Sequence, residues 1–139
     1  MNQNCYSRFI TDLFSAPWQF CDGAHFGLIA SLEMIDPVEF FAAAPMKRER
    51  NGKFWDVEVS PRGDRAVLNI SGPLYKKVDP MMKQFFGLAD LKEIDSDIEE
   101  LIRDKSIRHV VQHIDSPGGL ARASSSTAEL VEELADAKD

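Results

Sequence analysis

The residues with the clearest potential for chemistry lie in the stretch Gln112–Gly119, QHIDSPGG. Gly118 and Gly119 have no side chains, so a substrate backbone can come close to them, and they can adopt the positive φ that lets successive amide N–H groups point the same way. Two such donors beside a helix N-terminus can hold a developing oxyanion. Pro117 stiffens the turn, and we expect the Ser116 hydroxyl to form a hydrogen bond that shapes it. Because Pro-Gly-Gly also ends strands in many proteins without any chemical role, the flanking elements must decide between the two interpretations.

We expect no nucleophile among the residues around this turn. His113, Asp115 and Ser116 are close in sequence, but neighbouring residues of a strand point to opposite faces, so they are not expected to line up as base, orienting group and nucleophile. The serines at positions 124–126 are typical N-cap residues for a following helix. The lysines at positions 76, 77 and 83 are expected to be solvated.

Two strands and an amphipathic helix are predicted before the turn. In WDVEVS, Trp55–Ser60, apolar and polar residues alternate, which is typical of a strand with one wet face. A second strand, Ala66–Ile70, follows a turn at Pro61–Asp64. A helix then begins near Asp90, which has capping-box spacing to Glu93. Its apolar stripe consists of Leu91, Ile94, Ile98, Leu101 and Ile102.

The turn itself joins a strand, Ile107–Ile114, to a last helix at about Ser126–Ala137. Strand, helix, strand and helix at these lengths predict a βαβα unit with a parallel, right-handed crossover. The turn then lies at the C-terminal end of a parallel strand, where α/β sheets gather their ligands. Gln112 and His113 are unusual in such a strand, because burying an unpaired amide costs ~1–3 kcal/mol. Either this face is wet, or Gln112 has a partner, or the sequence has drifted from the pattern.

The first part of the chain has a different character. Residues 1–52 are predicted to be a helical and irregular leader, in which Asp36-Pro37 opens a short helix. Residues 53–139 contain the βαβα unit. The segment from Leu74 to Leu88 has weak periodicity, so it is either a long loop or a loose helix.

Composition narrows the functional classes. The chain has 139 residues and a net charge of −7, which disfavours binding to a nucleic-acid backbone. Cys5 and Cys21 lack metal-site spacing, and we expect neither a metal nor a cofactor. No secretory signal is recognisable, and acidic residues interrupt the apolar segment Ala24–Ala44 too often for it to span a bilayer. We therefore expect a cytoplasmic protein.

The chain resembles the serine peptidases of the signal peptide peptidase A type in four successive features: the strand AVLNISGPL, the acidic amphipathic helix, the strand and turn IRHVVQHIDSPGG, and the last helix. The variant it is most similar to is the phage head-maturation (capsid assembly) protease. The resemblance covers roughly Ala66 to Asp139 and, more loosely, the leader. It implies an α/β chain with a partial ClpP/crotonase-like fold, in which the βαβα unit with its SPGG turn follows a mostly helical leader.

The resemblance also implies an activity. The family cleaves peptide bonds, in capsid or scaffold proteins or signal peptides, with a serine nucleophile and a lysine general base. Its glycine turn supplies the oxyanion hole, a role that falls here on Gly118 and Gly119. The nucleophile and the base are expected beyond Asp139, so no catalytic residue is expected in this chain. We expect a truncated serine peptidase-like protein of phage or prophage origin that is inactive alone.

Two other functions stay open. The chain is alternatively a non-catalytic assembly or interaction module of a prophage capsid system or, with less support, an acyl-CoA-binding crotonase-like protein. Because a partial fold exposes strand edges and apolar faces, we expect self-association or a complementing chain. Phage capsid, portal or scaffold proteins are the expected partners, and a virion-associated location is the alternative to the cytoplasm.

Overall fold

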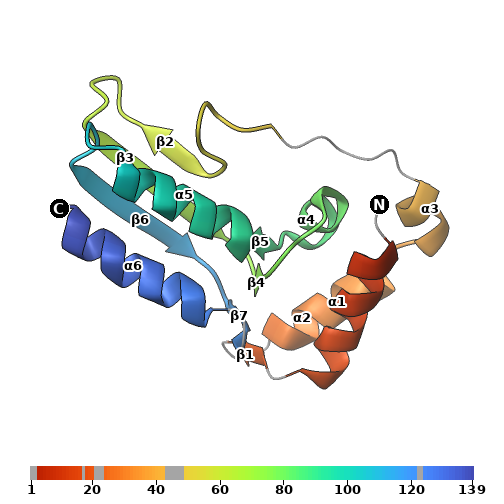
Figure 1. Cartoon of the computed structure of the whole chain (residues 1–139). Helices are drawn as coiled ribbons and strands as arrows, with labels where there is room; N and C mark the ends of the chain where they lie inside the picture. The colour runs from red at the N-terminus through yellow and green to blue at the C-terminus, as the bar shows by residue number, and fades with distance from the viewer. Residues whose placement is uncertain (1–2, 17, 21–23, 43–48, 122–123) are drawn as a thin grey trace.

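The structure is a computed structural model that describes residues 3–16, 18–20, 24–42, 49–121 and 124–139. These residues form a mixed α/β structure with N-terminal helices (Figure 1). The helices are α1 (Gln3–Ser15), α2 (Ala24–Glu33), α3 (Pro37–Ala42), α4 (Pro80–Phe86), α5 (Leu91–Arg103) and α6 (Ser125–Ala137). The strands are β1 (Trp18–Phe20), β2 (Val57–Val59), β3 (Arg65–Ser71), β4 (Leu74–Tyr75), β5 (Ala89–Asp90), β6 (His109–Asp115) and β7 (Gly118–Leu120).

The sheet with the longer strands, called the larger sheet below, contains the expected parallel pair. Its strand order is β2-β3-β6, with β2 antiparallel to β3 and β3 parallel to β6. The parallel register runs from Arg65 opposite His109 to Ser71 opposite Asp115. α5 lies between β3 and β6 in the chain, and α6 packs against α5 (Figure 1). The predicted order of strand, helix, strand and helix and its parallel pairing are therefore confirmed.

The two faces of this sheet differ. One face packs against the helices, and its buried residues on β3 are Ala66, Leu68 and Ile70. On β6, His113 is exposed, Gln112 is half-buried and Val111 is 61% exposed. His113 and Val111 therefore lie on a wet face, whereas Gln112, opposite the buried Leu68, lies on the helix side of the sheet and is half-buried there.

A second sheet of short strands joins the two ends of the chain. Its order is β1-β7-β4-β5, with β1 antiparallel to β7 and β4 parallel to β7 and β5. β1 was not expected, because three residues are too few for a periodic signal. The segment from Leu74 to Leu88, for which a loop and a helix both stayed open, contains β4 and the short helix α4.

Aromatic side chains tie the leader to this second sheet. Phe9 of α1 is fully buried, and its ring centroid lies 5.3 Å from those of Tyr75 and Phe86. Beside it, Trp18 stacks on Tyr75 at 5.9 Å. The Tyr75 hydroxyl donates to the Asp12 carboxylate (2.6 Å), so the buried carboxylate has a partner. The N-terminal helix and the β-rich segment thus share one core.

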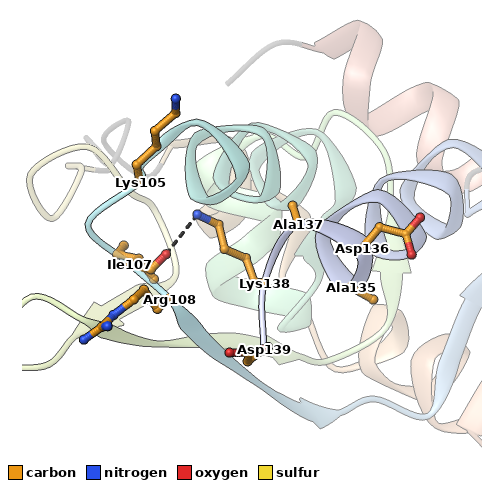
Figure 2. Close-up of a pocket in the computed structure, with 8 residues that line it drawn as sticks. All are labelled: Lys105, Ile107, Arg108, Ala135, Asp136, Ala137, Lys138 and Asp139. Carbon is orange, nitrogen blue, oxygen red and sulfur yellow. Dashed lines mark hydrogen bonds between the residues drawn. The ribbon is translucent and has the colours of Figure 1, made fainter.

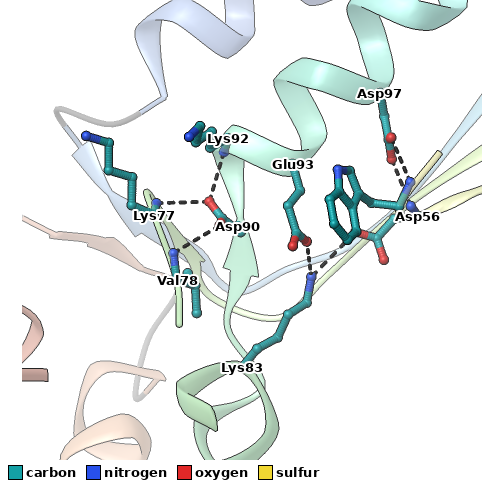
Figure 3. Close-up of polar contacts among 9 residues, drawn as sticks. Asp56, Lys77, Val78, Lys83, Asp90, Lys92, Glu93 and Asp97 are labelled. Atoms are coloured by element: carbon teal, nitrogen blue, oxygen red, sulfur yellow. Dashed lines mark hydrogen bonds and ion pairs between the residues drawn. The ribbon is translucent and has the colours of Figure 1, made fainter. Parts of the chain in front are cut away.

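Acidic residues in and just before α5 bind the segments around it (Figure 3). Asp90 is the N-cap, as predicted, and it also accepts from the N–H groups of Lys77 (2.9 Å) and Val78 (3.0 Å). Glu93, predicted as the other half of a capping box, forms an ion pair with Lys83 at 2.9 Å. The predicted apolar stripe is confirmed, with four of its residues buried and Ile102 half-buried.

The most buried acid of α5 is Asp97, which is 1% exposed. Its two carboxylate oxygens accept from the N–H groups of Trp55 and Asp56, each at 2.8 Å. Burial raises the pKa of the Asp97 carboxyl above its ordinary value, although these two N–H groups act in the opposite direction. Asp97 therefore fixes the segment that leads into β2.

Several smaller predictions about the leader can also be compared with the structure. α3 begins at Pro37, and the N–H of Val38 donates to the Asp36 carboxylate at 2.8 Å, which confirms the predicted helix start. No helix in the described ranges is long and apolar enough to cross a membrane. The Cys5 side chain and Cys21 lie outside the described residues.

Candidate functional site

The candidate site lies where the parallel strands β3 and β6 end together. Ser71 and Asp115 are opposite each other in the last pair of the ladder, and the N–H of Gly72 donates to the carbonyl of Asp115 at 3.0 Å. Two glycine-containing turns therefore meet at the carboxyl ends of these two strands: the turn at Gly72 after β3, and the SPGG turn after β6. The sequence predicted the site at this end of the sheet.

The side chain of Ser116 holds the two turns together. Its hydroxyl donates to the carbonyl oxygen of Gly72 at 2.8 Å, and its oxygen accepts from the N–H of Gly118 at 3.2 Å. The hydroxyl thus both shapes its own turn and links it to the turn after β3. Pro117, which follows it, is half-buried and belongs to no strand or helix.

Glycine is required at positions 118 and 119 for different reasons. Gly118 has φ of +118°, a backbone conformation that other residues adopt only under strain. Gly119 lies in β7 between Gln19 of β1 and Leu74 of β4. A Cβ at Gly119 would lie 2.3 Å from the carbonyl oxygen of Leu74. The missing side chain of Gly119 therefore allows β7 to pack closely against the chain's own backbone in β4.

The glycines do not lead directly into a helix. Gly118 and Gly119 begin the strand β7, and α6 starts at Ser125. The expectation of two N–H donors beside a helix N-terminus differs from the structure in this respect, because β7 lies between the turn and α6. The physical reason is that Gly118–Leu120 finds strand partners on both sides, β1 and β4, and paired backbone is favoured over an open turn.

Gly72 belongs to the site and was not singled out from the sequence. Its φ is +91°, and a Cβ there would lie 1.8 Å from the carbonyl oxygen of Gly87. Because Gly72 directly follows β3, the parallel pairing of β3 with β6 was sufficient to place it beside the SPGG turn. The predicted pairing therefore contained a signal for this residue.

A serine and a lysine predicted to have simpler roles lie together near the turn. The Nζ of Lys76 donates to the Ser126 hydroxyl oxygen at 3.3 Å, and both residues are half-buried. Lys76 follows β4, which pairs with β7, so the contact is close in the fold to the glycines. The expectation that Lys76 is simply solvated is wrong. The N-cap position of α6 is Ser124, but its side chain forms no capping hydrogen bond.

The histidines near β6 do not join the turn. The hydroxyl of Ser116 is directed to Gly72 and Gly118 rather than to His113, which agrees with the rejection of a triad. His109 has a partner that the sequence did not indicate, because its Nδ1 lies 3.8 Å from a carboxylate oxygen of Asp139. Among the residues that the structure describes, no group of three or more His, Cys, Asp or Glu side chains is arranged to hold a metal ion.

Comparison of the chain with models of protein families, with curated protein sequences and with solved structures finds no match. The functional interpretation of the site therefore rests on the residues and geometry of the turn.

Proposed function

We propose that the SPGG turn is the oxyanion-binding element of a serine peptidase-like protein of the signal peptide peptidase A type, with a ClpP/crotonase-like arrangement of its βαβα unit. In this proposal the nucleophilic serine and the lysine base come from polypeptide outside residues 1–139. The carrying observation is the place of the turn: it follows β6 at the shared end of two parallel strands, with Gly118 at positive φ. Ligands of α/β sheets bind at this edge.

Gly118 is the donor on which the proposal depends most. Its N–H donates to the Ser116 hydroxyl oxygen at 3.2 Å, the long end of the range for such bonds. A charged oxygen forms a stronger hydrogen bond than a hydroxyl, so an oxyanion in front of the turn would compete with Ser116 for this N–H. Gly119 lies between β1 and β4, and we expect its N–H to contribute only where one of these two strands gives way.

The test is reconstitution of hydrolysis. The purified chain is assayed on casein and on a fluorogenic peptide, alone and after co-expression with the polypeptide encoded directly downstream of it. We expect no turnover by the chain alone, turnover in the presence of a downstream polypeptide that supplies the serine and the lysine, and loss of that turnover in Gly118→Pro, which has no N–H at this position.

A matched variant separates the oxyanion role from a folding defect. Gly63 also has positive φ but lies in the turn between β2 and β3, with open space around it. Gly63→Pro is therefore expected to lower stability without a selective loss of turnover. Turnover by the chain alone would contradict the assignment of the nucleophile to another polypeptide, and reconstituted turnover that survives Gly118→Pro would contradict the oxyanion role.

A second candidate function is an assembly module of a capsid system, and two exposed apolar residues of β6, one on each face, favour it. Val111 and Ile114 are 61% and 59% exposed, and exposed apolar groups on a strand favour association. Co-purification of the tagged chain with capsid, portal or scaffold protein is the expected result. Recovery of the tagged chain without any of these proteins, at every salt concentration tried, would count against this candidate.

A further inference from the structure

The two N–H groups of the glycines in the SPGG turn face partners from within the chain. The N–H of Gly118 donates to the Ser116 hydroxyl oxygen at 3.2 Å. The N–H of Gly119 is directed either to β4 or to β1, because β7 lies between these two strands. The strand that it faces is the one that has to move before this N–H can bind an anion.

The pairing of β4 decides between the two strands. β4 lies between β5 and β7, and on its β5 side the N–H of Ala89 donates to the carbonyl of Pro73 at 2.9 Å. In a parallel ladder this bond means that Leu74, which follows Pro73, directs its own N–H and carbonyl to the opposite side, towards β7. Leu74 is paired there with Gly119, so it bonds through the residues before and after Gly119. The N–H and the carbonyl of Gly119 itself therefore face β1, where Gln19 is its partner.

β1 therefore occupies the second donor of the turn. In an antiparallel pair, two residues that face each other in this way exchange both of their N–H···O bonds. The carbonyl of Gln19 thus lies where an oxyanion would have to lie to reach the Gly119 N–H. Figure 1 shows β1 beside β7, next to the leader helices. A segment of the leader is placed across the candidate site.

Of the two neighbours of β7, β1 is the one that can leave. It stands at the end of the strand order β1-β7-β4-β5, and β7 is the only strand that it pairs with in the described part of the chain. β4 is paired on both sides, and a Cβ at Gly119 would lie 2.3 Å from the carbonyl oxygen of Leu74. Removal of β1 exposes one strand edge, whereas removal of β4 divides the sheet.

Aromatic side chains hold β1 in place. Trp18 and Phe20, on either side of Gln19, are half-buried, and their rings stack on each other at 5.0 Å. The Trp18 ring also stacks on Tyr75 at 5.9 Å, and its indole N–H donates to the carbonyl of Asp12 at 2.8 Å. Alternate residues of a strand share a face. A segment that replaces β1 therefore keeps these contacts when it is extended and carries aromatic residues at two alternate positions.

The pocket at the other end of β6 takes no part in this arrangement. Its volume is about 390 Å³, and Figure 2 shows its residues at the last turn of α6 and just before β6, whereas the SPGG turn follows the end of β6. The Lys138 amine in its wall donates to the carbonyls of Asp104 and Ile107, at 2.8 and 2.9 Å. Access to this pocket does not depend on β1.

From these observations we infer that β1 is an autoinhibitory strand of the candidate site, which an extended segment with aromatic residues at two alternate positions displaces. The Gly119 N–H then passes from the Gln19 carbonyl to a carbonyl of the incoming segment, the oxygen that becomes negatively charged on hydrolysis. Extended segments bind at sheet edges in this way, through main-chain hydrogen bonds and pockets for alternate side chains. The inference rests on the proposed oxyanion role of the turn and adds its regulation.

The first measurement is amide hydrogen exchange by NMR, on two variants that differ in one main-chain group. Gln19→Pro removes the N–H that Gln19 directs at Gly119, whereas Gln19→Ala keeps it. We expect the Gly119 amide to exchange at least ~10-fold faster in Gln19→Pro than in Gln19→Ala, a factor that corresponds to about 1.4 kcal/mol of lost strand pairing. The Leu120 amide, which the same register directs at Leu74 of β4, should exchange equally in both variants. Equal exchange there excludes global unfolding as the cause.

A peptide then tests the chemistry of the displacing segment. The Gln19→Pro chain is titrated into the millimolar range, where a free segment can match a tethered one. The peptides are Ala-Trp-Gln-Phe-Ala and, as the control without aromatic residues, Ala-Ala-Gln-Ala-Ala. We expect the aromatic peptide to restore slow exchange of the Gly119 amide and the control peptide to have no effect.

Reconstituted hydrolysis connects the strand contact to activity. With the downstream polypeptide of the proposed function present, we compare kcat/KM of the two Gln19 variants on the fluorogenic peptide. Because apparent affinity scales with the fraction of molecules whose site is open, Gln19→Pro should have a kcat/KM at least ~10-fold above that of Gln19→Ala. The gain should match the change in Gly119 exchange, since both report displacement of β1.

The remaining outcomes separate this inference from the proposed function. Equal Gly119 exchange in the two variants would overturn the inference, as would equal protection by the two peptides. Equal turnover of the two variants, although their Gly119 exchange differs, would overturn the inhibitory role of β1 and leave the oxyanion role in place. Absence of turnover in both variants, with the exchange results as expected, would overturn the proposed function and with it the inhibitory role.

Discussion

The two sheets of this molecule differ in how many neighbouring strands their last strands have. In the second sheet, called the small sheet here, β7 has a strand on each side, and aromatic residues from α1 and β1 cover it. In the larger sheet, β6 has a strand on one side only and carries exposed Val111 and Ile114. The glycine turn joins the end of the open strand to the start of the enclosed one.

This difference separates the place where the chain is rigid from the place where it can accept a partner. Backbone that is paired on both sides and covered by a packed core resists local opening, whereas an exposed edge offers unpaired hydrogen-bonding groups. The turn is therefore held on its β7 side, while the β6 side stays accessible.

The largest effect is expected from opening the enclosed core. Phe9→Ala removes a fully buried ring that contacts Tyr75 and Phe86, and it should lower the free energy of unfolding by about 3–5 kcal/mol. Phe14→Ala in the same helix is the control, because its side chain is 67% exposed and should change stability by less than about 0.5 kcal/mol. Urea unfolding at neutral pH measures both. Equal losses in the two variants would mean that α1 does not pack on the small sheet as described.

The next largest effects are expected from replacing Gly119 and Gly27 by alanine, which should change the stability in opposite directions. Gly119→Ala places a methyl group 2.3 Å from the carbonyl oxygen of Leu74, so β7 and β4 must separate, at a cost of about 2–3 kcal/mol. Gly27 lies within α2 with nothing near its missing Cβ. Gly27→Ala should stabilise by about 0.5–1 kcal/mol, because alanine favours helix. Thermal melts of both variants would refute the close packing of β7 if Gly119→Ala melted at or above the wild type.

The elements that the sequence predicted well are those with a long periodic signal. α5 carries five apolar residues at helical spacing and an N-cap at Asp90, and β3 and β6 are apolar runs bounded by turns. Their parallel pairing then followed from the helix between them. These features are local or depend on the order of elements alone, so a single sequence contains them.

The features that the sequence did not predict depend on residues far apart in the chain. β1 exists because Trp18–Phe20 pairs with Gly118–Leu120, and nothing in three residues signals a partner so distant. The same holds for the Lys76–Ser126 contact and for the packing of Gly119 on Leu74. The positive φ of Gly118 and the turn-shaping hydrogen bond of Ser116 agree with the prediction from residue type, but the packing of Gly119 could be found only from the tertiary structure. Its oxyanion role stays a prediction.

Asp97 tests how the open sheet is attached to the rest of the chain. Its carboxylate accepts from two N–H groups just before β2, and asparagine has only one acceptor oxygen at this position. Asp97→Asn should therefore cost about 2 kcal/mol at neutral pH, since one buried N–H loses its partner. Glu99→Gln, on the exposed side of the same helix, is the control and should be nearly neutral, because it alters only an exposed ion pair with Arg103. A loss in Asp97→Asn no larger than in the control would show that β2 is held by other contacts.

The smallest effect is expected at Asp104, the C-cap residue of α5, and its pH dependence has a defined direction. The hydroxyl of Ser106, then Lys53 and the N–H of Ser106, lower the pKa of Asp104 to about 2. Because this folded-state pKa lies below the ordinary value of about 3.8, the contribution of Asp104 is present above pH 3.8 and is lost as the pH falls towards 2. Asp104→Ala should therefore lower stability by about 1 kcal/mol at pH 7 and approach the wild type near pH 2, as measured by urea unfolding across this range. A deficit that stayed constant with pH would mean that the Asp104 side chain stabilises the end of α5 through packing and not through its charge.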